Sequence, residues 1–460
     1  MLIDPSSVIS FIVKQARKYW TAGHERTLAI KKNIIYIFFI RGVGILVTFL
    51  LVPLTIHYIN AGQYGVWLTI SSMVIWINNF DIGLSNGLRN KMAHSLAVND
   101  HENTRKYIST TYAILFCIAS FIFVAFYIVG SFFNWNQLLN ITGTVNYDIW
   151  PIIVITLGSF CIRFFLQPIS SILTATQQPF KSSLIQLLGQ ILTLIAIYLL
   201  TIFTKSSLVF MVVAVSMAPV IVFLLANIYV FVTHLRAYAP RLTFIDLKSA
   251  KSLFSVGGIF FIIQIGILIL METDNIILSR TLGPQSVTVF NVAFKYFSLG
   301  NVLFIIMVSP YWSAFTDAYA KNDMEWIREA NRRMQTILLY MSGFIVVLYF
   351  FSGIFYQLWV GQSVTVPGSL SLSMMAFIIV VNWQSMCAVA LNGIGKLRLQ
   401  LILVVTTSLI NIPLSVWLIR MIGINGTVIA NIILMGAISV VLHFQVKLIL
   451  GQKATGIWNK

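Results

Sequence analysis

Residues 183–233 read SLIQLLGQILTLIAIYLLTIF-TKSS-LVFMVVAVSMAPVIVFLLANIYVFVT, and Lys205 is the single charged residue among them. An apolar helix of about 20 residues crosses the hydrocarbon core of a bilayer, which is about 30 Å thick. The tetrapeptide TKSS is a short polar connection, so the second apolar run has to return across the membrane beside the first. This stretch therefore predicts a hairpin of two membrane-spanning helices.

Similar runs recur along the whole chain, in which 58% of the residues are hydrophobic and 9% are charged. Soluble domains carry about 25% charged residues, so this composition excludes a soluble globular fold. We predict an all-α polytopic membrane protein with about twelve transmembrane helices. The predicted spans lie near residues 33–53, 64–86, 107–130, 149–172, 183–203, 208–233, 253–278, 287–312, 335–357, 368–391, 399–419 and 426–449.

The net charge of +17 comes from basic residues in the loops and does not indicate nucleic-acid binding. The bases form neither a groove-reading element nor an Arg-rich tail, and they sit in short gaps between the apolar runs. One alternating set of loops, together with both termini, holds most of them, whereas the opposite set holds only Lys205, Arg280 and Arg420. By the positive-inside rule, we predict that both termini are cytoplasmic and that the number of spans is even.

The two halves of the chain resemble each other. The loop after the second span contains Asn99-Asp100-His101-Glu102, and the loop after the eighth contains Asn322-Asp323-Met324-Glu325, which lies close to half the chain length further on. Two further pairs of similar segments are Tyr58–Gly62 with Arg280–Pro284, and Thr176–Pro179 with Asn392–Gly395. We predict two six-helix lobes related by a pseudo-two-fold axis along the membrane normal, with a central cavity between them.

The predicted organisation has five parts. Residues 1–32 have apolar positions near one helical face, which is typical of an amphipathic helix on a membrane surface, although a frayed leader fits equally well. The parts are a cytoplasmic leader at 1–32, an N-terminal lobe at 33–233, a cytoplasmic linker at 234–251, a C-terminal lobe at 252–450 and a cytoplasmic tail at 451–460. The basic leader has no signal-type apolar run, which argues against a cleaved signal peptide.

Basic residues inside the predicted spans are candidates for a binding cavity, because a charge at the centre of a bilayer costs about 2.5–3.5 kcal/mol on insertion scales. They lie on polar stripes with helical spacing, whereas a single Ser, Thr or Asn on such a stripe more often fastens helices together. The predicted cavity residues are Arg41, Arg163, Lys295, Gln167, Gln186, Gln190, Asn291 and Asn382. Amides and hydroxyls suit sugar hydroxyls, and Arg and Lys suit phosphate or carboxylate.

Acidic residues in the seventh span are candidates for ion coupling or gating. Glu272 shares a polar stripe with Asn275, and a carboxylate facing a cavity can carry a proton or a sodium ion. Glu272 could instead form a permanent ion pair with Lys295 that only fastens two helices. Asp274 lies about 200° around the helix from Glu272, so we do not expect the two carboxylates to form one site.

Asp81 and Asp317 are two further candidates for ion coupling or gating, near the cytosolic ends of the second and eighth spans. Each has a simpler interpretation, since Asp81 could pair with Arg89, and Asp317 could cap its helix or pair with Lys321. We predict no metal site and no cofactor other than a coupled proton or sodium ion. The sequence has no P-loop, no H-E-x-x-H motif, no nucleophile elbow and no Cys/His cluster.

Residues 80–91 read FDIGLSNGLRNK, and residues 274–278, 282–284 and 293–295 read DNIIL, LGP and AFK. With twelve spans in two halves, these motifs resemble the polysaccharide-specific transporters of the multidrug/oligosaccharidyl-lipid/polysaccharide (MOP) exporter superfamily, and in particular the Wzx-type O-antigen flippases. The resemblance covers residues 33–450. The chain differs from the fourteen-span lipid II flippases, because it offers no thirteenth or fourteenth span.

The resemblance implies a function and a location. Such proteins carry an undecaprenyl-pyrophosphate-linked oligosaccharide across the bacterial inner membrane by alternating access, driven by a proton or sodium gradient. It also implies a cationic cavity, which Arg41, Arg163 and Lys295 would provide, and a role for acids at the places of Asp81 and Asp317. The implied partners are the lipid-linked oligosaccharide, membrane lipids, a polysaccharide polymerase and a chain-length regulator, but no nucleic acid.

Three other functions compete with this interpretation. A drug/cation antiporter of the same superfamily would need acids on the first-half cavity face, where Arg41 and Arg163 stand instead. A membrane-embedded glycosyltransferase or polymerase usually has a large outward loop with catalytic residues, but the longest outward loop here, 131–148, has Asp148 as its only acid. A channel is disfavoured by the two-fold repeat. We therefore expect a transporter and not an enzyme.

Overall fold

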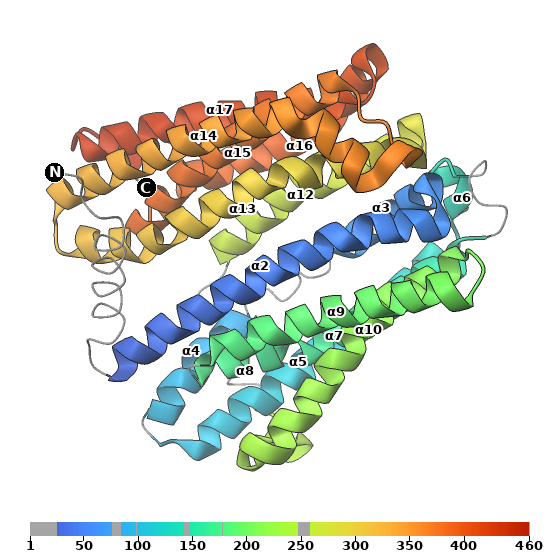
Figure 1. Cartoon of the computed structure of the whole chain (residues 1–460). Helices are drawn as coiled ribbons and strands as arrows, with labels where there is room; N and C mark the ends of the chain where they lie inside the picture. Colours follow the sequence, from blue (N-terminus) through green and yellow to red (C-terminus); the bar gives the residue numbers. More distant parts are fainter. Residues whose placement is uncertain are drawn as a thin grey trace, which may run out of the picture.

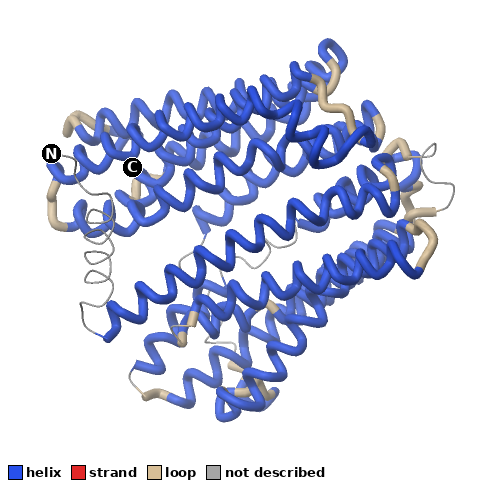
Figure 2. Tube along the Cα trace, viewed as in Figure 1, coloured by secondary structure: helices blue, strands red, loops and turns tan. Residues whose placement is uncertain are grey.

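The computed structural model describes residues 25–75, 84–97, 99–141, 148–176, 178–246 and 258–459 of the chain. Within these ranges every regular element is a helix or a helical turn (Figure 2). Helices are the expected elements, because a spanning segment in hydrocarbon has to satisfy all of its own backbone hydrogen bonds. The predicted all-α fold class is confirmed.

The helices fall into two groups along the chain. The first group comprises α2 (Glu25–Ile59), α3 (Ala61–Ile75), α4 (Leu84–Ala97), α5 (His101–Gly130), α6 (Trp135–Leu138), α7 (Trp150–Leu166), α8 (Pro168–Ala175), α9 (Pro179–Phe203) and α10 (Leu208–Tyr229). The second comprises α12 (Gly258–Leu282), α13 (Pro284–Ala320), α14 (Met324–Val360), α15 (Gly368–Ile394), α16 (Arg398–Ile422) and α17 (Asn425–Leu450). Short π and 3-10 turns follow α10, at Val230–His234, Arg236–Tyr238 and Leu242–Phe244.

Most of the predicted spans agree with these helices. In the described part of the chain, 10 helices are long and apolar enough to cross a membrane, and α3 and α12 stand where the second and seventh spans were predicted. Some helices are longer than their predicted spans, since α14 begins at Met324 and not near residue 335. Its first turns bury Ile327, Ala330 and Met334, so the helix continues beyond the apolar run that marks the hydrocarbon layer.

The fourth span is interrupted at Pro168. Helix α7 ends at Leu166, Gln167 lies in a turn, and Pro168 begins α8. Proline lacks an N–H group and its ring clashes with the preceding turn of a helix. The span therefore continues as two helical pieces joined at Gln167.

The predicted internal repeat is visible in the backbone. The equivalent residues Asn99 and Asn322 both adopt left-handed conformations, with φ of 56° and 57°. The following residues, Asp100 and Asp323, cap the next helix by accepting a hydrogen bond from the N–H three residues on, at 3.0 Å in both cases. At Asp100, which lies outside the spans, this bond from Asn103 lowers the pKa of the carboxyl group. Both halves therefore use the same helix-capping turn.

A second turn repeats with the same spacing along the chain as Asn99 and Asn322. Asn60 separates α2 from α3 with φ of 80°, and Gly283 separates α12 from α13 with φ of 88°. Asn and Gly are the residues that enter this left-handed region most readily. The two helix pairs that these turns join are therefore equivalent elements of the two halves.

The two groups of helices form two lobes (Figure 1). The lobes converge at the end of the molecule where α2 passes into α3, and they diverge towards the end that holds the C-terminus (Figure 1). Helix α3 belongs to the first lobe by sequence, but it packs mainly against α13 and α12 of the second lobe. In the described part of the chain, the lobes thus meet at the converging end and are apart at the other.

We call the contact between α3 and α13 at the converging end the seal. The Thr288 hydroxyl donates a hydrogen bond to the carbonyl oxygen of Ala61 at 2.6 Å. A Cβ atom on Gly65 would lie 1.8 Å from the carbonyl oxygen of Pro284. Only glycine permits this approach, since any side chain at position 65 would collide with a backbone atom that cannot move aside.

The seal relates equivalent positions of the two halves. Ala61 and Pro284 are equivalent positions, and so are Gly65 and Thr288. Each pair has the same spacing along the chain as the repeated turns. The hydrogen bond from position 288 to position 61 is therefore the pseudo-symmetry mate of the close contact between positions 65 and 284. The pseudo-two-fold axis passes through this pair of helices.

A second contact between the lobes follows from a proline. Because Pro53 lies inside α2 and has no N–H group, the carbonyl oxygen of Phe49 lacks its usual helical donor. The indole N–H of Trp359, from α14 of the other lobe, donates to that oxygen at 2.6 Å. Ring contacts hold the indole in place, at 4.8 Å from Phe49 and 5.4 Å from Phe355 between centroids. A side chain of the second lobe thus donates the hydrogen bond that a backbone carbonyl group of the first lobe lacks.

The first prediction concerns this indole bond. The variant Trp359→Phe loses the bond to Phe49, and we expect closure of the converging end to weaken by about 1 kcal/mol, or about fivefold in population. The same change in a Pro53→Ala background should have little effect, because residue 53 then supplies a helical N–H to Phe49. Distances between spin labels at His57 and Ser363, which line one pocket at this end, measure the closed population.

The comparison of the two backgrounds is the control. Equal losses of closure from Trp359→Phe with and without Pro53 would show that the indole acts only through its ring contacts.

Candidate functional site: a basic cavity between the lobes

A cavity of about 550 Å³ lies between α2 and α9 of the first lobe and α13 and α14 of the second. It lies on the diverging side of the seal, where Phe49 and Trp359 form part of its wall. The polar side chains that line it are Arg41, Thr48, Thr174, Ser182, Ser183, Gln186, Gln190, Lys295 and Ser298. Apolar residues of α2, α9 and α13 complete the lining, so the cavity offers both polar and apolar surfaces.

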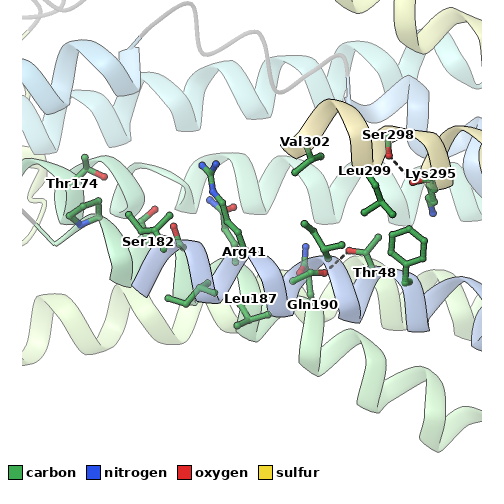
Figure 3. Close-up of a pocket in the computed structure, with 18 of the residues that line it drawn as sticks. Arg41, Thr48, Thr174, Ser182, Leu187, Gln190, Lys295, Ser298, Leu299 and Val302 are labelled. Atoms are coloured by element: carbon green, nitrogen blue, oxygen red, sulfur yellow. Dashed lines mark hydrogen bonds between the residues drawn. The ribbon is translucent and has the colours of Figure 1, made fainter. Parts of the chain in front are cut away.

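Two bases face the cavity at different depths (Figure 3). Arg41 lies seven residues before Thr48 on α2, which corresponds to about 10 Å along a helix, and Lys295 of α13 lies near Thr48 (Figure 3). The Arg41 side chain is exposed and has no hydrogen-bonding or ionic partner in the described part of the chain. The Lys295 ammonium donates to the Tyr64 hydroxyl at 2.8 Å.

No Asp or Glu occurs among the described residues that line this cavity. Two positive charges without an acidic partner repel each other, and the half-buried position of Lys295 strengthens that repulsion by lowering the local dielectric constant. An anionic ligand would relieve it, and hydrogen bonds to charged donors are about twice as strong as neutral ones. The arrangement can therefore hold an anion with hydroxyl-rich groups around it.

The structure divides the eight predicted cavity residues into two sets. Arg41, Gln186, Gln190 and Lys295 line the cavity, whereas Arg163, Gln167, Asn291 and Asn382 lie outside its lining. Asn291 donates to Asn275 of α12 at 2.7 Å, and Asn382 of α15 accepts from Asn301 of α13 at 2.8 Å. Both amides thus bridge neighbouring helices of the second lobe, in agreement with the alternative that polar stripes fasten helices together.

Arg163 and Gln167 lie within the first lobe. The Arg163 guanidinium stands over the ring of Phe223 on α10, 5.4 Å from its centroid, and its Nε atom is buried without a hydrogen-bond partner. Gln167 lies at the break between α7 and α8. The helical spacing in the sequence identified a polar face of the fourth span correctly, but it could not show that this face turns towards α10.

Asp274 forms a buried polar chain inside the second lobe. Its side chain is 1% exposed, and one carboxylate oxygen accepts from the amide of Asn431 on α17 at 2.6 Å. Asn431 accepts from Asn411 on α16 at 2.7 Å, and Asn411 accepts from Thr273 on α12 at 3.3 Å. The second oxygen of Asp274 has no hydrogen-bond partner. This carboxyl group can take up a proton or a cation without contacting the cavity.

The other predicted acids are placed differently. Neither Glu272 nor Lys295 takes part in an ion pair within the described part of the chain, so the two residues are not paired with each other in this conformation. Asp81 lies outside the described residues. Asp317 lies in α13, but its side chain is outside the described set.

Sequence reasoning missed three residues that shape this region: Tyr64, Gly65 and Trp359. A proline inside a predicted span could have indicated that the Phe49 carbonyl needs an outside donor. No sequence signal could have shown that the donor is Trp359, which lies on a different lobe. Tyr64 and Gly65 follow closely on the repeated Tyr58–Gly62 segment, which was the available hint.

Residues 30–316 match the family described as polysaccharide biosynthesis protein. The chain belongs to this family. Residues 260–417 also match the MatE family. The predicted relationship to the Wzx-type members of the MOP exporter superfamily is thereby confirmed, and it accounts for the two-lobed architecture.

Individual proteins support the same assignment. A protein of Yersinia pseudotuberculosis named for O-antigen export is 21% identical over 378 residues, which cover 78% of this chain and 82% of that protein. An inward-facing multidrug resistance MATE family transporter of the MOP superfamily has the same fold, with a TM-score of 0.74 at 16% identity over 88% of this chain and 95% of that one. An outward-facing transporter of the same description has a TM-score of 0.58, and the match covers 92% of this chain and 96% of that one.

The second prediction concerns the two cavity bases. Arg41→Gln and Lys295→Gln should each weaken binding of inorganic pyrophosphate by about tenfold, the factor that about 1.4 kcal/mol represents, because each removes a charged donor. Arg163→Gln should leave the affinity within about twofold, because Arg163 lies outside the lining. Calorimetric titration of the purified protein measures all three affinities.

Equal affinity in the Arg41 and Lys295 variants and in the unmodified protein would contradict anion binding in this cavity. A loss confined to Arg163→Gln would place the anion inside the first lobe.

Proposed function

We propose that the protein moves an oligosaccharide linked to undecaprenyl pyrophosphate from the cytoplasmic to the outer leaflet of the bacterial inner membrane, by alternating access between its two lobes. The observation that carries the proposal is the acid-free cavity between the lobes, where Arg41 and Lys295 stand among hydroxyl and amide side chains in the described lining. The family, which is described by polysaccharide biosynthesis, and the relative named for O-antigen export support the same substrate class.

The lining suits the three chemical parts of such a substrate. The Arg41 guanidinium can hold a phosphate group with two parallel hydrogen bonds, and Lys295 adds a point charge. The hydroxyls of Ser182 and Ser183 and the amides of Gln186 and Gln190 can hydrogen bond to sugars. Apolar lining residues such as Ile37 and Ile40 on α2 suit the first isoprene units of the lipid. The cavity thus matches the headgroup and the beginning of the tail.

The orientation of the cavity fits uptake from the cytoplasm. The charge distribution over the loops predicts that the end holding the C-terminus faces the cytoplasm, and the lobes diverge at that end (Figure 1). The chain also superposes better on the inward-facing than on the outward-facing transporter. We therefore interpret this conformation as open to the cytoplasm and closed by the seal on the outer side.

A drug/cation antiporter is the competing function, because the structural relatives are multidrug transporters. A cationic cargo requires acids at its binding site, whereas the described lining of this cavity contains two bases and no acid. Electrostatics therefore favours an anionic cargo. A polysaccharide polymerase and a chain-length regulator, which would act on the product, are the partner proteins that this function suggests.

We also propose that transport is coupled to a proton or sodium gradient through Asp274. Its carboxyl group joins α12, α16 and α17 through side-chain amides, and one of its oxygens has no partner. Binding a proton or a sodium ion there would change the hydrogen bonding between three helices of one lobe. Glu272, the candidate that the sequence favours, has a half-buried side chain on the same helix.

The third prediction tests transport itself. Proteoliposomes loaded on one leaflet with a fluorescently labelled undecaprenyl-pyrophosphate oligosaccharide should expose the label to a quencher on the other side. The double variant Arg41→Ala with Lys295→Ala should slow this exposure at least about tenfold, because it removes both charged donors. Arg332→Ala, at an exposed position on α14, is the matched control and should transport normally.

Two results would refute the proposed function: normal flipping in the double variant, or export of a cationic dye with no flipping of the lipid-linked oligosaccharide. Cysteines at positions 140 and 455 report the orientation of the protein in the same vesicles.

The fourth prediction separates the two coupling candidates. Asp274→Asn keeps the shape of the side chain but cannot bind a proton, so flipping should continue at a reduced rate and lose its response to an imposed gradient. Glu272→Gln should keep the gradient response if Asp274 is the coupling group. Measuring flipping with and without proton and sodium gradients distinguishes the two. A full gradient response in Asp274→Asn would remove Asp274 from the mechanism.

A further inference from the structure

A charged contact joins the cavity to the seal. The Lys295 ammonium of the second lobe donates to the Tyr64 hydroxyl of the first lobe at 2.8 Å and lies 5.5 Å from the centroid of its ring. Tyr64 is 4% exposed, whereas Lys295 is half-buried and lines the cavity (Figure 3). One partner of the bond is therefore accessible to a ligand, and the other is enclosed between the lobes.

Tyr64 stands between the two contacts that make up the seal. Ala61, one turn earlier on α3, accepts the hydrogen bond of Thr288, and Gly65, the next residue, meets the Pro284 carbonyl. All of these contacts connect α3 to α13. Separation of the two helices therefore requires the Lys295 bond to break together with the seal.

The Lys295 ammonium group has more hydrogen-bond donors than its bond to Tyr64 uses. It carries three N–H groups, and within the described residues it has Tyr64 as its hydrogen-bond partner and no carboxylate. A neutral hydroxyl is a weaker acceptor than an anionic oxygen. An anion that reaches the inner end of the cavity therefore competes with Tyr64 for Lys295.

This arrangement occurs on one side of the pseudo-two-fold axis only. With the spacing that relates the repeated turns, the positions equivalent to Tyr64 and Lys295 are Val287 and Ser72. Both are buried, and neither can form a charged contact. The Lys295–Tyr64 bond is thus a feature that the two halves do not share, in contrast to the turns and the seal.

We propose that Tyr64 and Lys295 link occupancy of the cavity to opening of the seal: a pyrophosphate group bound in the cavity draws the ammonium away from Tyr64 and removes a bond that holds the lobes together on the outer side. The identity of the anion rests on the proposed function, whereas the link itself requires only an anion. An empty transporter then keeps its outer side closed, which limits futile cycling of the lobes.

The test measures the seal directly, in the full chain reconstituted in nanodiscs. Spin labels at His57 and Ser363 report the separation of the lobes beyond the seal, after replacement of Cys117, Cys161 and Cys387. The probe is farnesyl pyrophosphate, and farnesol is its uncharged counterpart. We expect farnesyl pyrophosphate to raise the separated population by about fivefold, the lower range of measured couplings between sites, and farnesol to have no effect.

Tyr64→Phe removes the acceptor and keeps the ring. We expect it to raise the separated population about fivefold without any probe, and further addition of farnesyl pyrophosphate should then change little. Tyr58→Phe is the matched control, because the Tyr58 hydroxyl bonds within the first lobe, to Thr204 and to the carbonyl oxygen of Lys205. It should behave like the unmodified protein.

The affinity for pyrophosphate provides a second measurement. It would not change if Tyr64 had only a structural role. Coupling between two equilibria is reciprocal, so Tyr64→Phe should bind inorganic pyrophosphate about fivefold more tightly than the unmodified protein. Unchanged affinity together with an unchanged resting population in Tyr64→Phe would overturn the proposal, as would a lack of response to farnesyl pyrophosphate in the unmodified protein. If the seal responds as expected but the lipid-linked oligosaccharide is not flipped, the proposed function fails and the link stands.

Discussion

The close approach of α3 to α13 at Gly65 governs how the two lobes are arranged. With a backbone carbonyl oxygen 1.8 Å from the place of a Cβ atom, the helices meet more closely than any side chain would permit. The lobes converge at this contact and diverge towards the opposite end of the molecule (Figure 1). The cavity, its opening and the positions of its two bases all follow from where this contact is made.

Electrostatics then determines what the cavity can accept. Bases without acidic partners are costly in a membrane protein, and Arg41 has no partner in the described part of the chain, while Lys295 has a neutral one. Asp274 of the second lobe lies outside the cavity lining, in a chain of hydrogen bonds with asparagines on α16 and α17. In the described residues, the basic lining of the cavity and the buried carboxyl group of Asp274 are thus separate in space.

The sequence predicted those features that depend on local chemistry. Apolar length located most of the helices, and the repeated Asn-Asp pair marked equivalent turns of the two halves, which the structure shows to be helix caps. Features that depend on residues far apart in the chain could not be predicted from the sequence. Helical spacing showed that Arg163 lies on a polar face but not which helix covers that face. The bond between Asp274 and Asn431 joins residues 157 positions apart, and no periodicity encodes it.

The seal has the geometry of a contact between two copies of one protein. Position 61 contacts 288, the equivalent of 65, and position 65 contacts 284, the equivalent of 61. A symmetric dimer must place the same residue at both equivalent positions, so a change that helps one side is imposed on the other. Fusion of the halves into one chain lifts that restriction. Here one copy of the position became glycine, which gives room, and the other threonine, which gives a directed bond. Neither residue alone could serve both purposes, so this interface depends on the two halves having diverged.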